Sequence, residues 1–89
     1  MTNVLRFCEM KQKEVINIKD GARFGFVSDM EIDCEDGKII SIIIPGEGKI
    51  FGMFGNDQEY RVPWDKITQI GEDLILIDCD TDKVLVDCD

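Results

Sequence analysis

The stretch that decides the fold is GFVSDMEIDCEDGKIISIIIPG, residues 25–46. Its first ten residues alternate, so that a strand over residues 25–34 would present one face made of Phe26, Ser28, Met30, Ile32 and Cys34. The opposite face carries Val27 and three carboxylates, and this period of two predicts one buried and one solvated face. Asp36-Gly37 then supplies the backbone twist of a tight hairpin. The returning strand, residues 39–44, is apolar on both faces, which predicts that both are covered.

The rest of the chain continues this pattern of short strands separated by turn residues. Further strands are predicted at residues 14–18, 59–62, 68–70 and 74–78, with one tight helical turn at 63–67 around Trp64. No apolar stripe of helical period is long enough for a substantial helix. We therefore expect an all-β fold, a small antiparallel β-barrel with its edges largely closed. The predicted core is Phe26, Met30, Ile32, Ile40, Ile42, Trp64 and Ile67.

The length of 89 residues leaves room for one domain with one modest core. We assign residues 1–78 to the barrel and residues 79–89 to an acidic C-terminal tail. Within this tail, Val84-Leu85-Val86 is either an added strand or a loose end.

The charge of the chain is strongly negative and unevenly distributed. The net charge is −9, with five Lys/Arg against three Asp/Glu in residues 1–25 and three against ten in residues 56–89. Such a surface repels phosphate backbones and anionic lipid, so direct nucleic-acid binding is not expected. The N-terminus lacks the apolar stretch of a secretory signal, and no apolar run approaches the length that crosses a bilayer. A cytoplasmic protein without membrane insertion is expected.

The four cysteines are Cys8, Cys34, Cys79 and Cys88, and no histidine is present. Without a signal peptide, a reducing compartment and free thiols are the expectation. A zinc site would need four scattered thiolates, whereas structural zinc sites bring their ligands in closely spaced pairs. We predict neither a cofactor nor a metal.

The glycine spacing resembles that of a known family. Gly21, Gly25, Val27 and Asp29 fit the pattern Gly-x-x-x-Gly-x-Val-x-Asp of PRC-barrel domains, followed by Asp36-Gly37 and Val62-Pro63-Trp64. Residues 45–67, PGEGKIFGMFGNDQEYRVPWDKI, resemble more narrowly the YlmC/YmxH group, small stand-alone PRC-barrel proteins associated with sporulation. Related barrels mediate protein contacts in the photosynthetic reaction centre H subunit and in the ribosome maturation factor RimM. The resemblance implies a binding module in which the motif glycines relieve steric conflict and Val27 packs inside.

One glycine-rich segment carries the candidate contact residues. Ile50, Phe51, Met53 and Phe54 stand between Gly48 and Gly55, where the spacing matches no phosphate-binding fingerprint. These side chains either fold back into the core or form an apolar contact surface. In the second case, a homodimer or a different protein would cover them.

Two groups of carboxylates offer a second hypothesis, a divalent-cation-binding protein. Asp29, Glu31 and Asp33 project from one strand face, although a solvated row paired with Lys or Arg is favoured. In the tail, Asp78, Asp80 and Asp82 match positions one, three and five of a calcium loop, and Asp89 matches position twelve. However, Lys83 stands where that loop needs glycine.

Catalysis is not expected, because Ser28 and Ser41 have no base in the sequence that would activate them. A thiol-redox response remains an alternative, although Cys34 is predicted on the core face, where thiols are usually inert. The sequence thus favours a non-enzymatic protein-interaction module.

Overall fold

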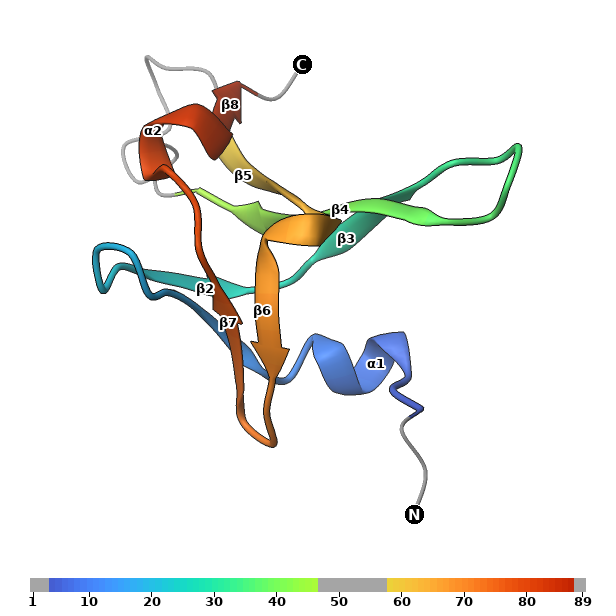
Figure 1. Cartoon of the computed structure of the whole chain (residues 1–89), viewed down its shortest axis with the longest axis horizontal. Coiled ribbons are helices and arrows are strands. Elements are labelled where there is room, and N and C mark those ends of the chain that lie inside the picture. Colours follow the sequence, from blue (N-terminus) through green and yellow to red (C-terminus); the bar gives the residue numbers. More distant parts are fainter. Residues whose placement is uncertain (1–3, 47–57, 88–89) are drawn as a thin grey trace.

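The computed structural model describes residues 4–46 and 58–87, which form two four-stranded sheets (Figure 1). The strand order is β2-β1-β7-β6 in the first sheet and β3-β4-β5-β8 in the second. The strands are β1 Glu14–Asn17, β2 Arg23–Phe26, β3 Asp29–Ile32, β4 Ile39–Pro45, β5 Gln58–Pro63, β6 Ile67–Ile70, β7 Leu74–Ile77 and β8 Leu85–Asp87. The helical elements are α1 Phe7–Met10, the single 3-10 turn η1 Trp64–Lys66, and α2 Thr81–Val84. The mostly-β prediction and the helical turn at Trp64 are confirmed.

The prediction of a closed antiparallel barrel is wrong in two respects. Neither sheet closes on itself in the described part of the chain, so β2, β6, β3 and β8 are edge strands. In addition, β1 pairs with β7 in parallel, with Val15 opposite Ile75. Tight turns enforce antiparallel pairing only between strands that follow each other directly. Because β1 and β7 are far apart in the sequence, alternation and turn signals left their direction undetermined.

The predicted strand over residues 25–34 is in fact two strands that belong to different sheets. β2 pairs with β1 in the first sheet, whereas β3 pairs with β4 in the second. The chain changes sheets at Val27 and Ser28. Side chains before and after this point therefore do not share one common face. Val27 is therefore buried and Phe26, predicted on the core face, is exposed. Cys34, also predicted on the core face, is exposed because it lies in the turn after β3.

The core lies between the two sheets. Its buried apolar members are Met10, Val15, Phe24, Val27, Ile42, Ile44, Val62, Ile75, Ile77, Cys79 and Val84. Of the predicted core, Ile42 is buried. Met30, Trp64 and Ile67 are partly buried and pack against the buried cluster. The prediction that Phe26, Ile32 and Ile40 belong to the core is wrong, because each is about half exposed. Ile32 and Ile40 belong to the β3–β4 hairpin, which projects beyond the core (Figure 1), and a register shift there leaves Ile40 unpaired.

The motif glycines have the structural role that the resemblance implies. Gly21 and Gly37 have φ of +75°, each at a predicted turn, and Gly25 has φ of +108°. These values lie where side chains with a Cβ are strained. A Cβ on Gly25 would also meet Ile44 Cγ2 at 3.8 Å, an ordinary contact, so backbone conformation is the reason for glycine there.

The segment that begins at Cys79 is joined to the fold through Asn17, a fully buried polar residue on β1. Its amide nitrogen donates to the Cys79 carbonyl at 2.8 Å and to Thr81 Oγ1 at 3.1 Å, and its oxygen accepts from Cys79 N–H at 3.2 Å. After α2, strand β8 pairs with β5, and Val86 lies opposite Glu59. The segment assigned to a tail thus contributes a core residue, Val84, and an edge strand.

Candidate functional site

The outer face of the first sheet carries an apolar surface that we call the outer patch. Along β1 and β7 the inward residues are fully buried, so the alternating residues face outward. Phe26 on β2 is opposite Glu14 and shares this face. The patch comprises Ile16, Ile18, Phe26, Leu74 and Leu76.

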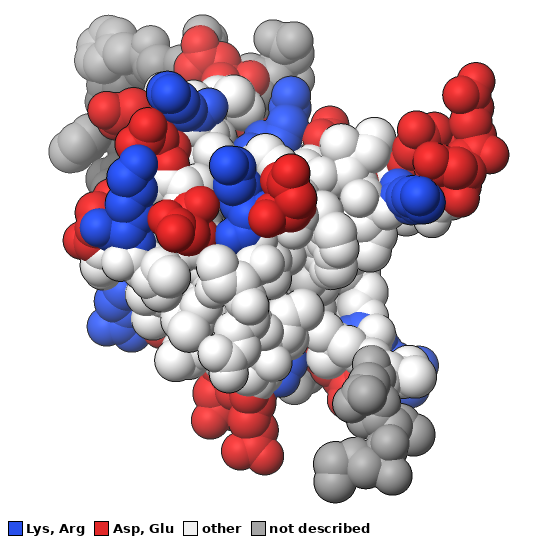
Figure 2. Space-filling view, viewed as in Figure 1, with Lys and Arg blue, Asp and Glu red and all other residues white. Residues whose placement is uncertain are grey.

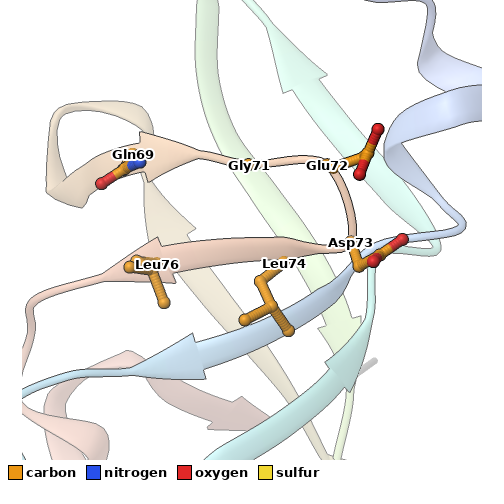
Figure 3. Close-up of a pocket in the computed structure, with 6 residues that line it drawn as sticks. All are labelled: Gln69, Gly71, Glu72, Asp73, Leu74 and Leu76. Atoms are coloured by element: carbon orange, nitrogen blue, oxygen red, sulfur yellow. The ribbon is translucent and has the colours of Figure 1, made fainter.

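A shallow pocket of about 220 Å³ lies at the β6–β7 end of this patch. Leu74 and Leu76 project from the same side of β7 into it, and Gln69 borders it from β6 (Figure 3). The carboxylates of Glu72 and Asp73 stand at the turn. Figure 2 shows a broad uncharged surface over β6 and β7, with charged groups gathered around its margins. The pocket thus offers apolar contact from two leucines and polar groups at its border from Gln69, Glu72 and Asp73.

The second apolar surface is a hollow of about 410 Å³ beneath the β3–β4 hairpin, which we call the notch. The hairpin forms one wall, α1 and the residues before it form the other, and η1 and β6 form the floor. Its lining residues are Leu5, Arg6, Phe7, Met10, Met30, Ile39, Trp64 and Ile70. Ile32 shares the face of Met30 on β3 and extends this surface outward.

The sequence anticipated only part of these surfaces. Trp64 and Met30, predicted as core, line the notch as half-buried residues. The contributions of Leu5, Phe7 and Ile70 were missed, since no pattern in the sequence shows that the N-terminal segment packs beside β6. The predicted contact residues Ile50, Phe51, Met53 and Phe54 lie outside the described residues.

The carboxylates of the cation-binding hypothesis do not converge. In residues 4–46 and 58–87, no group of three Asp, Glu or Cys side chains is placed to hold a metal ion. Glu31 makes an ion pair with Arg61 at 3.7 Å across the sheet. Asp80 pairs with Lys19 at 3.1 Å and with Lys83 at 3.6 Å, and hydrogen bonding to Lys19 lowers the Asp80 pKa. Asp89, the fourth member of the calcium pattern, lies beyond the described residues.

The candidate nucleophiles lie apart from one another. Cys79 is buried, and desolvation raises the pKa of its thiol, which favours the unreactive protonated form. Cys8 and Cys34 are exposed free thiols. Ser28 donates to the Ile43 carbonyl, and the buried Ser41 donates to Glu31. Each serine is thus part of the hydrogen bonding of the β3–β4 region.

No helix among the described residues has the length and apolarity that crossing a bilayer requires.

Comparison with known proteins links the fold to a family. A model of the PRC-barrel domain matches residues 2–84. The chain is 39% identical over 74 residues to the probable sporulation protein YlmC of Bacillus subtilis, covering 83% of this chain and 91% of YlmC. It is 38% identical over 76 residues to YmxH of the same organism, covering 83% and 88% of the two chains. It is also 42% identical over 71 residues, 80% of each chain, to an uncharacterised protein of Clostridium acetobutylicum.

The match to the family model includes strands of both sheets, among them β1 and β7, and extends to the end of α2. The resemblance first seen in the Gly21–Asp29 motif is therefore confirmed along most of the chain. The chain therefore belongs to the PRC-barrel domain family.

Proposed function

We propose that this chain is a non-enzymatic, cytoplasmic protein-interaction module that acts during sporulation. One observation carries the proposal: the described part of the chain leaves nine large apolar side chains exposed, and most of them gather at the notch and the outer patch. Contiguous exposed apolar surface on a small protein marks sites of contact with other proteins. The name of the relative in Bacillus subtilis supplies the biological setting.

The charge distribution supports a protein partner over nucleic acid. The net charge is −9, and the apolar surfaces carry no basic cluster of the kind that neutralises several phosphates. Aromatic and Met side chains, such as Phe7, Met30 and Trp64 at the notch, are typical of protein interfaces. The segment with Ile50, Phe51, Met53 and Phe54 remains a predicted additional contact surface.

Genetic complementation in the organism that encodes the chain tests this function. Deletion of the gene is expected to lower the yield of heat-resistant spores, and wild-type protein should restore it. Leu74→Ser with Phe26→Ser, which alters the outer patch, should fail to restore it at equal protein level. Asp65→Asn, a change in an exposed polar residue that lines neither the pocket nor the notch, is the control. Normal spore yield after deletion would refute the role in sporulation.

A separate set of variants examines the segment outside the described residues. Phe51→Ser with Phe54→Ser should abolish function without lowering the melting temperature if these side chains form a contact surface. Global unfolding of this variant would show that the segment belongs to the core.

A further inference from the structure

We propose that two copies of this chain associate across a two-fold axis, with the β3–β4 hairpin of each copy seated against α1 and the notch of the other. The inference goes beyond the proposed function, because self-association and a role in sporulation can each fail without the other.

The first support is shape. The β3–β4 hairpin projects from the body of the molecule (Figure 1). Met30 and Ile39 of this hairpin line the notch. Ile32 and Ile40 lie at the outer end of the two strands, next to the turn, and are each 51% exposed, which is unusual for isoleucines in a strand pair. Each copy therefore carries both a projecting apolar element and a hollow of about 410 Å³ lined mainly by apolar side chains.

The second support is charge complementarity between the segment that contains α1 and the tip of the hairpin, which lies beyond the notch. Residues 4–13 hold three basic side chains and one acidic, a net charge of +2, whereas residues 33–38 hold three acidic side chains and one basic, a net charge of −2. Figure 2 shows the acidic group at the end of the hairpin, away from the body of the molecule.

Within one copy, Lys13 donates to the Gly71 and Glu72 carbonyls, whereas four other charged side chains of these two segments make no ion pair in the described part of the chain. Among the described residues, the ion pairs involve neither Arg6 nor Lys11, and Lys11 instead lies 5.6 Å from the Phe7 ring. The same ion pairs leave out Glu35 and Asp36 at the hairpin tip. Opposite charges on one molecule that do not pair with each other are available to a partner.

A second copy fits this arrangement better than another protein. In an isologous contact, each copy presents the same surface, so the acidic tip of one copy meets the basic α1 of the other twice. A partner with a single sign of charge would be repelled by one of these two segments. At the outer patch, by contrast, Arg23 makes two hydrogen bonds to Glu14, at 2.9 and 3.0 Å. These two charges are therefore already paired within one copy.

Charge reversal on either segment tests the contact. Arg6→Glu with Lys11→Glu changes the α1 segment from +2 to −2. Glu35→Lys with Asp36→Asn changes the tip from −2 to +1, and the asparagine retains a side-chain oxygen for the Lys38 N–H, which donates to Asp36 at 3.0 Å. In both cases like charges face each other in the homodimer. Sedimentation velocity is expected to show dimer dissociation constants raised about tenfold or more for each variant alone.

A mixture of the two variants provides the decisive experiment. In the mixed dimer, the −2 tip of one variant meets the +2 segment of the other, and the +1 tip meets the −2 segment. Native mass spectrometry of the mixture should show heterodimers with close to wild-type affinity, which also proves that both variants are folded. Asp82→Lys with Asp87→Asn is the control for net charge, since it adds the same three charge units on exposed residues away from the notch.

Three outcomes would overturn the proposal. The wild-type chain could be monomeric at all accessible concentrations, the single variants could dimerise as wild type does, or the mixture could associate no better than its components. The last result would show that a dimer forms through another surface.

Discussion

At the scale of single residues, the described structure depends most on Asn17, because one buried amide satisfies both the N–H and the carbonyl of Cys79. Asn17→Ala should lower the free energy of unfolding by about 2 to 4 kcal/mol, since it leaves two buried backbone groups without partners. Urea denaturation measures this loss. Gln69→Ala, which removes an exposed amide, should change stability by less than about 0.5 kcal/mol. Equal effects of the two substitutions would contradict the structural role of Asn17.

A second residue-scale feature is the carboxylate of Asp20, which accepts from the Ala22 N–H at 2.9 Å and from Thr81 Oγ1 at 2.7 Å. The Ala22 hydrogen bond is the largest of the causes that lower the Asp20 pKa, and the Thr81 hydrogen bond is the next. A depressed folded-state pKa gives stability that is complete above the unfolded value of about 3.9 and is lost as pH falls through the folded value.

The melting temperature of the wild-type chain should therefore decline below about pH 4. Asp20→Asn keeps an oxygen acceptor but removes the titration, so its curve should be flatter between about pH 4 and 2.5. Parallel curves for the two proteins would show that Asp20 does not contribute to acid unfolding.

At the scale of secondary-structure elements, α2 and β8 make residues 81–87 part of the domain. Val84 is buried in the core cluster, whereas its neighbour Lys83 is exposed. Val84→Ala should cost about 1 to 3 kcal/mol in the free energy of unfolding through lost burial and a small cavity, and Lys83→Ala should cost nearly nothing. Thermal unfolding followed by circular dichroism distinguishes them. If Val84→Ala is neutral, residues 79–87 are an appendage after all.

The elements also show what could be predicted from the sequence. Turns carried by Gly21 and Gly37 were found, because a positive φ leaves a direct trace in residue type. The break between β2 and β3 was missed, since Val27 and Ser28 continue the alternation while the backbone moves to another sheet. The parallel β1–β7 pairing was missed because long-range strand direction has no local signal.

The candidate surfaces were harder to predict than the fold. Ile32 and Ile40 have the composition of core residues, and only the length by which the hairpin exceeds the core exposes them. Leu5 and Phe7 stand beside charged residues in the sequence and gain their place from the packing of α1 next to Ile70. Exposed apolar side chains are therefore a property of the assembled fold and cannot be read from alternation alone.

At the scale of the whole molecule, two open sheets hold a projecting hairpin and a short helix apart. The resulting notch has an apolar lining. The segment with α1 beside it is basic, and the tip of the hairpin is acidic. Amide hydrogen–deuterium exchange on the unmodified chain tests whether this notch is a protein-contact surface.

Exchange should be measured below and above the concentration at which the chain associates. Residues 5–11 and 29–40 should become more protected at high concentration, while residues 14–18 and 74–77 of the outer patch should be unchanged. Added protection confined to the outer patch, or no added protection at the notch while the chain dimerises, would show that the notch is not the contact surface.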